Sequence, residues 1–281
     1  MLEFTACVVC GSSLNTLKLT KKSRLGELFN LTSCNECGHK FVSPRPSEKS
    51  IAAYYQSDYF KVRDDRGYDN YFSEETKSEI CRIFNLNLKD LNFKKFSAKS
   101  HNSLDIGCAA GYFVEYMKNL GWNAHGIDLS SNCIDAGKLR NLNLLCADYL
   151  LTEYNVKFNL ITMWVTIEHL HHPENFLKKI YLDLDDNGAL YISTCCADGL
   201  GFMKLFGNKW RFYNFPEHLN FFSLKNIKKV LKQNGFKIKK TVIYGSGVGS
   251  GKSIIKKIAD FIARHFRLGD MMLIHAVKQR Q

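Results

Sequence analysis

The sequence has no long apolar segment and little proline. No run approaches the roughly 18 consecutive apolar residues that a membrane-spanning helix requires, and only four of the 281 residues are proline, so a proline-rich tract is excluded. The first ten residues lack the basic segment followed by an apolar segment that is typical of a signal peptide. With 45% hydrophobic and 23% charged residues, the composition also argues against disorder and against a disulfide-stapled miniprotein. We therefore expect a soluble, cytoplasmic, globular protein.

Acidic residues are scarce at one end of the chain. Residues 1–220 contain 25 basic and 25 acidic side chains, whereas residues 221–281 contain 14 basic side chains and only two acidic ones, Asp260 and Asp270. The whole net charge of +12 therefore belongs to the last fifth of the sequence. Such an asymmetry indicates a polyanionic partner, which could be a nucleic acid, an anionic membrane surface or a phosphorylated substrate.

Four of the ten cysteines have the spacing of metal ligands. Cys7 and Cys10 form one C-x2-C pair, Cys34 and Cys37 form another, and a glycine follows each pair. Four thiolates in two such pairs match a tetrahedral Zn²⁺ site with a structural role; the alternative is a set of unrelated thiols or a redox pair. We assign no chemistry to the other six cysteines, and we expect His39, beside the second pair, to be a bystander.

Two prolines separated by one residue divide the N-terminal module from the rest of the chain. Ser43-Pro44-Arg45-Pro46 opposes helix and strand alike, so we predict a zinc-ribbon module over residues 1–46 and a helical linker or lid over residues 47–100. Helices are expected at 47–56 and 73–89. Between them lies an aromatic stretch. We expect most of its rings to pack the helices onto the main domain, while some could line a substrate pocket: Tyr54, Tyr55, Tyr59, Phe60, Tyr68, Tyr71 and Phe72.

Short apolar segments alternate with helical periodicity over residues 101–281. This alternation predicts a parallel sheet covered by helices on both faces, with ligands bound at the carboxyl ends of the strands. The expected strands are 103–107, 123–128, 143–147, 158–165, 188–194, 236–244 and 271–277. The expected helices are 111–120, 130–139, 174–183, one capped by Ser223 that ends at Gly235, and one near 252–267.

Small residues form the first strand-to-helix turn of this domain. Gly107 and Gly111 lie where a strand ends and a helix begins, which lets backbone N–H groups approach a ligand. A dinucleotide fingerprint would also need glycine at 109 and 112, but these residues are Ala109 and Tyr112, which argues against NAD. Acidic residues lie at the ends of three successive strands, on one rim of the sheet: Asp105, Asp128 and Asp148. This arrangement predicts a ligand site in which Asp128 accepts the hydroxyls of a ribose.

These residues resemble the class I S-adenosylmethionine-dependent methyltransferases, and the resemblance covers residues 103–278. It implies a Rossmann-like α/β fold with a seven-stranded, mostly parallel sheet whose last strand is antiparallel. It also implies S-adenosylmethionine as the cofactor, with the first motif around the methionine part, an acid on the ribose, and a pair facing the adenine. In that order the implied binding residues are Asp105, Gly107, Cys108 and Gly111, then Asp128 and Leu129, then Asp148 and Tyr149. Ala109 departs from the glycine that many members carry.

Other segments are similar to bacterial zinc-ribbon methyltransferases of surface-polysaccharide and deoxysugar biosynthesis. The similarity lies in the N-terminal cysteine pairs, in Ser43-Pro-Arg-Pro46, in Tyr54-Tyr55 before Tyr59, and in the segment Phe-Pro-Glu-His-Leu-Asn-Phe-Phe-Ser at 215–223. It implies that the acceptor is a small molecule, a sugar or glycan precursor that could be phosphorylated or nucleotide-linked. Phe215 stands where those enzymes have a tyrosine, and the attacking atom, whether oxygen, nitrogen or carbon, is left open.

Histidines in two segments are candidates for the general base. The resemblance implies that His218 takes the acceptor proton, and its neighbour Glu217 could hold the imidazole. The alternative for His218 is an ordinary loop histidine. His169, after the fourth strand, is the second candidate. His171 and His172 are expected to be surface residues of a loop.

Two other function classes remain open. An RNA methyltransferase would use the basic C-terminal region, although the zinc module is not basic and no nucleotide-stacking module is evident. A noncatalytic scaffold would keep the fold without turnover. The segment Gly245–Ser253 is similar to a phosphate loop but has Ser246 where that motif needs glycine, so we interpret it as a flexible connector without ATP binding.

Apolar and basic residues alternate in the C-terminal helical segment. On a helix, one side would carry Ile254, Ile255, Ile258, Phe261, Ile262 and Phe266. We expect this face to be buried against the sheet, which leaves the basic residues to attract a phosphorylated acceptor. The less favoured alternative is an interfacial helix that docks on an anionic lipid surface.

Overall fold

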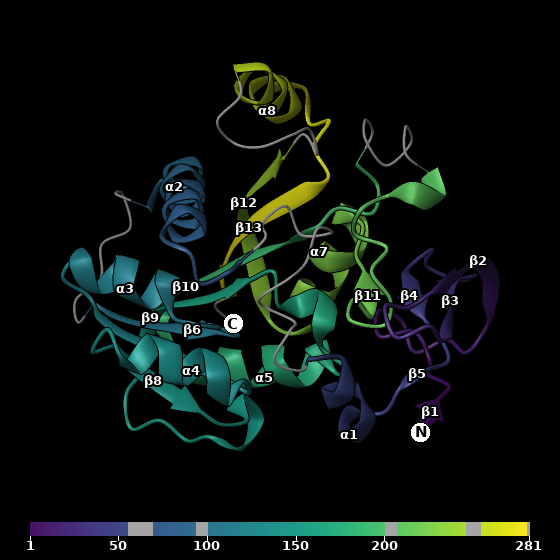
Figure 1. The fold of residues 1–281 in the computed structure, drawn as a ribbon, viewed down its shortest axis with the longest axis horizontal. Coiled ribbons are helices and arrows are strands. Elements are labelled where there is room, and N and C mark those ends of the chain that lie inside the picture. The colour runs from purple at the N-terminus through teal and green to yellow at the C-terminus, as the bar shows by residue number, and fades with distance from the viewer. Residues whose placement is uncertain (56–69, 94–100, 200–206, 246–253, 280–281) are drawn as a thin grey trace.

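The computed structural model describes residues 1–55, 70–93, 101–199, 207–245 and 254–279. Figure 1 shows a central sheet with helices packed around it, and beside it a smaller unit formed mainly by the N-terminal segment. Some residues of interest in the sequence lie outside the described ranges, namely the aromatic residues Tyr59, Phe60 and Tyr68 and residues 246–253 of the glycine-rich connector.

The central sheet has seven strands in the order β12-β13-β10-β9-β6-β7-β8. Strands β10, β9, β6, β7 and β8 are parallel, and β13 runs antiparallel between β10 and β12. This topology confirms the expected Rossmann-like α/β fold. The strands are β6 (Asn102–Ile106), β7 (Asn123–Asp128), β8 (Asn143–Cys146), β9 (Phe158–Trp164), β10 (Leu184–Cys195), β12 (Phe236–Tyr244) and β13 (Met271–Lys278).

Helices pack around the sheet, and three of them connect successive parallel strands. They are α2 (Glu74–Asp90), α3 (Tyr112–Asn119), α4 (Ser131–Lys138), α5 (Pro173–Asp183), α7 (Leu224–Gln233) and α8 (Ile254–Phe266), with short 3-10 turns η5 (Tyr149–Leu151), η6 (Ile167–His169) and η7 (Gly207–Lys209). Because helices lie on both faces, the middle strands are almost wholly buried: the last four residues of β6 and the first six residues of β9 are all buried. Ser223 caps α7 as expected, since its hydroxyl accepts from the backbone N–H of Asn226.

A four-stranded sheet forms most of the N-terminal unit. Its order is β11-β4-β3-β2, and a two-residue pairing of β1 with β5 lies beside it. The strands are β1 (Leu2–Glu3), β2 (Asn15–Lys22), β3 (Leu28–Cys34), β4 (Lys40–Val42), β5 (Arg45–Pro46) and β11 (Asn220–Phe221), followed in the chain after β5 by α1 (Glu48–Ile51) and η1 (Ala52–Tyr54). Strand β11 comes from the segment that contains His218, so the first 46 residues do not complete this sheet by themselves.

Two expectations about side-chain exposure are wrong. His171 is buried, with its Nε2 2.9 Å from the carbonyl oxygen of Pro46, so it joins the N-terminal unit to the main domain. The apolar face of α8 is exposed, and Ala263 is the buried residue of that helix. The helix packs through its polar side instead, because the guanidinium of Arg264 forms an ion pair with Asp90 at the end of α2. Among the described helices, none has the length and hydropathy needed to cross a membrane.

Candidate active site

The turn after β6 brings backbone N–H groups to the carboxyl edge of the sheet. Gly107 and Gly111 have φ values of 72° and 76°, in the left-handed region that favours glycine. A Cβ atom on Gly107 would lie 2.6 Å from the side chain of Thr166, so glycine is required there for space as well as for conformation. Ala109 has a φ of 47°, so the alanine keeps the backbone conformation that glycine would adopt more easily.

Asp128 ends β7 directly beside this turn. One carboxylate oxygen accepts from the backbone N–H of Ala109 at 2.8 Å, and the other accepts from that of Ser130 at 2.8 Å. Burial raises the pKa of Asp128 above its usual range, while these N–H groups favour its charged form. The turn and Asp128 therefore lie side by side at the rim, as the sequence predicts for a ribose-binding acid.

Asp105 lies inside β6, beneath the turn. It is buried and accepts a hydrogen bond from the hydroxyl of Thr162 at 2.6 Å. Burial raises its pKa to about 8, and the negative charge of Asp128 acts in the same direction, against the hydrogen bond from Thr162. Burial therefore favours the protonated form of this carboxyl.

The remaining residues expected at the cofactor divide into two groups. Leu129 is largely exposed at the rim, and Asp148 caps η5 by accepting from the backbone N–H of Leu150 at 2.8 Å. Cys108 and Tyr149 are buried, and the phenol of Tyr149 donates to Asp183 at 2.8 Å. Because its ring points into the core, Tyr149 is better placed to support the rim than to contact a ligand there.

The two candidate bases lie next to each other. The rings of His169, in η6, and His218, just before β11, are 4.7 Å apart between centroids and meet at 81°. One ligand atom each of Glu168, His169 and His218 lie within 4.8 Å of one another. The structure thus brings both histidines of the sequence prediction into one cluster, together with a carboxylate that the prediction did not single out.

Backbone carbonyls hold both imidazoles. Nδ1 of His169 lies 2.7 Å from the carbonyl oxygen of Glu217, and Nδ1 of His218 lies 2.9 Å from that of Phe212. Because a carbonyl oxygen only accepts, these contacts favour the tautomer with the proton on Nδ1 and leave Nε2 as the acceptor in each neutral ring. The carbonyl of Glu217 therefore orients His169, a role different from the one expected for its carboxylate.

Tyr55 is a neighbour of this cluster to which the sequence pattern assigns no role. Its hydroxyl lies 3.0 Å from Nδ1 of His169 and donates to the carbonyl oxygen of Glu217 at 3.2 Å. Tyr54, by contrast, is buried against Phe29, so it has a packing role as expected, but in the N-terminal unit rather than on the main domain. The sequence signals for Tyr55 are its place in the aromatic stretch and the Tyr54-Tyr55 pair in the similarity to zinc-ribbon methyltransferases. Neither signal distinguishes a packing role from a site.

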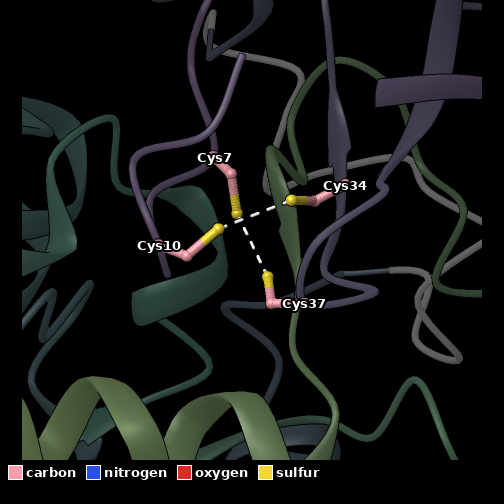
Figure 2. Close-up of side chains that lie close together, drawn as sticks. All are labelled: Cys7, Cys10, Cys34 and Cys37. Carbon is pink, nitrogen blue, oxygen red and sulfur yellow. Dashed lines mark hydrogen bonds between the residues drawn. The ribbon is translucent and has the colours of Figure 1, made fainter. Parts of the chain in front are cut away.

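The four cysteines with ligand spacing converge on one point (Figure 2). The Sγ atoms of Cys7 and Cys37 are 3.5 Å apart, as are those of Cys10 and Cys34, and all four thiols are free. A disulfide requires about 2 Å, whereas four sulfurs at about 2.3 Å from one Zn²⁺ would be separated by roughly 3.8 Å in a tetrahedron. The spacing therefore fits a tetrahedral metal site better than a redox pair.

His39 lies outside this set of four sulfurs. It is buried between Phe41 and Phe222, its Nε2 lies 3.3 Å from the side-chain oxygen of Asn220, and burial lowers its pKa to about 4. A neutral, buried ring at this place packs the N-terminal unit against β11, which agrees with the bystander role expected for it.

Backbone hydrogen bonds connect the cysteine module to the histidine cluster. The N–H of Val42 donates to the carbonyl of Leu219, and the N–H of Leu219 donates to the carbonyl of Glu168, each at 2.9 Å. Leu219 directly follows His218. The position of His218 therefore depends on the order of the N-terminal unit.

Much of the excess positive charge lies away from this site. A groove between α7 and the β12–β13 pair is lined by lysines, namely Lys228, Lys232, Lys237, Lys239 and Lys278. Phe236, the first residue of β12, pairs with Lys278, whereas the carboxyl end of β10 pairs with Met271 at the other end of β13. The groove is thus at the edge of the sheet opposite to the site, so these lysines give no support to a role in drawing an anionic acceptor to the histidines.

The chain is similar to known methyltransferases. The family described as "Methyltransferase domain" matches residues 72–241. The ubiquinone biosynthesis O-methyltransferase of Coxiella burnetii (strain Dugway 5J108-111) is 29% identical over 108 residues, covering 36% of this chain and 46% of that protein. The enzyme of the same name from Bradyrhizobium diazoefficiens is 27% identical over 178 residues, covering 57% and 69%. The chain thus spans less than half the length of the first of these relatives.

A solved structure shares the fold. The SAM-dependent methyltransferase from Archaeoglobus fulgidus superposes with a TM-score of 0.52 at 18% identity, covering 70% of this chain and 94% of that one. At this identity the likeness establishes the fold alone. None of the three proteins described above is named for polysaccharide or deoxysugar biosynthesis, so they do not support that part of the resemblance.

Proposed function

The chain belongs to the methyltransferase-domain family, and from this premise we propose that it transfers a methyl group from S-adenosylmethionine to a hydroxyl of a small molecule. The observation that carries the proposal is the position of the His169–His218 pair. Both residues lie beyond the carboxyl end of β9, next to the strand whose glycine turn and neighbouring Asp128 are suited to a nucleoside cofactor.

The rim residues fit the parts of such a cofactor. The N–H groups of the Gly107–Gly111 turn and the N-terminus of α3 suit the carboxylate of the methionine part. Asp128, with Leu129 beside it, suits the ribose, whose hydroxyls would replace one or both of its present backbone donors, and Asp148 would face the adenine. The bound cofactor supplies an electrophilic methyl group; the protein must orient the acceptor in line with it and remove the acceptor proton.

His218 is the first candidate for the general base that takes the acceptor proton, and His169 is the second. In the tautomers favoured by the carbonyls of Phe212 and Glu217, Nε2 of each ring carries the lone pair that can accept a proton. Glu168 lies within reach to stabilise the imidazolium that forms. Glu168, His169 and His218 also offer donor atoms that a divalent cation can use, so the test of the base includes a metal analysis.

A sugar or glycan precursor remains the first proposal for the acceptor, and the segment 215–223 supports it. Aromatic rings border the pair, with Phe212 stacked on His218 at 6.0 Å, and such rings can pack on the apolar face of a sugar. The second candidate is a ubiquinone precursor, because both of the relatives described above are named for ubiquinone biosynthesis. The lysine groove lies at the opposite edge, so the basic region gives no support to an RNA acceptor.

We also propose that Cys7, Cys10, Cys34 and Cys37 hold one structural Zn²⁺. The sulfur spacing supports this, and the free thiols are in keeping with it. Burial raises the pKa of the Cys34 thiol, but the N–H groups of Cys37 and Glu36 outweigh this effect and lower its pKa to about 7. The metal would thus bind a cluster with at least one thiol that ionises readily.

Calorimetry with S-adenosylhomocysteine, followed by an acceptor screen, tests the proposal. We expect saturable binding of the cofactor product and a further thermal shift with one acceptor class, nucleotide-linked sugars or hydroxylated quinone precursors. Mass spectrometry should then find the acceptor heavier by one methylene group. A protein that binds no S-adenosylhomocysteine would be a noncatalytic scaffold, which would refute the proposal.

A further inference from the structure

Helix α8 turns its apolar side to solvent. Six large apolar side chains are between 41% and 73% exposed: Ile254, Ile255, Ile258, Phe261, Ile262 and Phe266. They recur along the helix at intervals that place them on one face. A helix that packed on its own protein in the usual way would bury this face, so the exposed arrangement needs an explanation.

Polar contacts fix α8 in this orientation. Arg264 forms an ion pair with Asp90 of α2, and its guanidinium lies 5.4 Å from the centre of the Tyr244 ring. Next to it on the same side, Ala263 is buried, and Lys256 pairs with Asp260 at 2.9 Å. The helix therefore cannot turn its apolar face to the protein without breaking the contacts of Arg264 with Asp90 and Tyr244, whereas the Lys256–Asp260 pair lies within the helix.

The exposed side of α8 is apolar with basic borders. Lys257 and Arg267 are exposed, whereas Asp260, the acidic residue of the helix, is partly buried and paired with Lys256. Contiguous apolar side chains with cationic neighbours suit a surface that is apolar below and anionic above. The helix has 13 residues, which at about 1.5 Å each is too short to cross a bilayer but long enough to lie in its interface.

We propose that α8 docks the protein on an anionic lipid bilayer, with its isoleucines and phenylalanines inserted at the level of the headgroups and upper acyl chains. A second copy of the chain is the competing occupant of this face. Two helices packed face to face about a twofold axis would bring two sets of Lys257 and Arg267 together without an exposed acid to pair them. Anionic headgroups supply the missing negative charge, so lipid is favoured.

The docking surface lies at the edge of the sheet that carries the candidate active site. Helix α8 connects the end of β12 to the start of β13, and Met271 at that start pairs with Cys195 at the carboxyl end of β10. The glycine turn and His169 follow the carboxyl ends of the parallel strands β6 and β9 at the same edge. Figure 1 shows α8 at the outer end of the β12–β13 pair, next to α2. Docking would therefore hold this edge close to the lipid surface.

Cosedimentation with vesicles tests the proposal, with no need for activity. The full chain should bind vesicles of phosphatidylcholine with phosphatidylglycerol, should release as salt is raised, and should bind pure phosphatidylcholine much more weakly. Ile258→Asp should lower the affinity for anionic vesicles by about tenfold or more, since it removes one inserted side chain. Leu139→Asp changes an exposed leucine after α4 and should leave binding unchanged.

A matched pair of charge variants separates local docking from net charge. Lys257→Glu should weaken binding by about fivefold or more, whereas Lys229→Glu, at an exposed residue of α7, should change it much less. Circular dichroism and thermal melting confirm that each variant is folded. Equal effects of the two lysine variants, wild-type binding by Ile258→Asp, or no vesicle binding by the wild type would overturn the proposal. So would a dimer in solution that Ile258→Asp dissociates, because a second copy would then cover the face.

Discussion

The rings of His169 and His218 meet edge to face, with their centroids 4.7 Å apart, although the two residues lie in different segments of the chain. Each is held through Nδ1 by a backbone carbonyl. This arrangement orients two histidines from distant segments, so that either ring could serve as the base that we propose. Loss of either ring should therefore affect turnover.

Replacing His218 with alanine should lower kcat by roughly 10²- to 10⁴-fold, the effect of losing a general base. The affinity for S-adenosylhomocysteine should stay near that of the wild type, because the rim residues are unchanged. His172→Ala, at a half-exposed histidine after η6, is the matched control and should keep its turnover. Steady-state kinetics and calorimetry on the three proteins provide the measurements.

The result for His169 decides how the pair works. If His169→Ala is the more damaging change and His218→Ala is nearly harmless, the base is His169. Because two residues that act as a unit are not additive, the double variant should be little worse than the more damaging single variant. Full activity in the double variant would remove the pair from the mechanism. If either variant loses one equivalent of a divalent cation that the wild type binds, Glu168, His169 and His218 would instead be metal ligands.

Asp128→Asn should weaken the binding of S-adenosylhomocysteine by about tenfold or more. The expected loss is that of a charged acceptor for the ribose hydroxyls, and the amide keeps the shape of the side chain. Asp135→Asn, on the exposed side of α4, is the control for loss of one negative charge. Calorimetry that finds equal affinities for both variants and the wild type would remove the ribose assignment.

Cys34→Ser should reduce bound zinc below one equivalent and lower the melting temperature, because the metal supplies folding free energy to the N-terminal unit. Cys146→Ser, at an exposed cysteine outside the cluster, should change neither. Since Val42 and Leu219 connect this unit to Glu168, turnover should fall more than cofactor affinity does. One full equivalent of zinc in the Cys34→Ser protein would contradict the ligand assignment.

The buried carboxyl of Asp105 should make the ligand-free protein less stable as the pH rises. Its pKa is about 8 in the folded state and about 3.9 in an unfolded chain. Below about pH 4 both states hold the proton, whereas between the two values only the folded state does. The contribution of Asp105 to the free energy of unfolding therefore falls as the pH rises from about 4 to 8.

Comparison with Asp105→Asn isolates this effect. Burial lowers the pKa of His39 and of His275 to about 4, so these residues destabilise the fold as the pH falls below about 6.5 in both proteins. Their effect cancels in the difference between the two unfolding free energies. Denaturant unfolding should show the wild type losing stability relative to Asp105→Asn from pH 5 to 8. A constant difference would mean that Asp105 is ionised throughout this range.

Local patterns in the sequence were sufficient for the central fold. The strand-to-helix alternation predicts the seven-stranded sheet, because apolar periodicity reports which faces are buried in any packing. Gly107, Gly111 and the cysteine pairs are also recognised from short segments of sequence, since a tight turn and a tetrahedral site each demand specific residues at short spacing. The same is true of Ser223, which caps α7.

The tertiary structure alone decided which distant segments meet and which faces stay uncovered. Tyr55, Glu168 and His218 form one cluster because η6, β11 and the end of η1 converge, and no spacing in the sequence encodes that convergence. Burial of His171 likewise depends on tertiary structure, because it comes from the contact of His171 with Pro46 of the N-terminal unit. The amphipathic pattern of α8 correctly predicts a helix, yet it cannot say whether the protein or another surface covers the apolar side. The Arg264–Asp90 ion pair settles that question, because it commits the polar side of the helix to the protein.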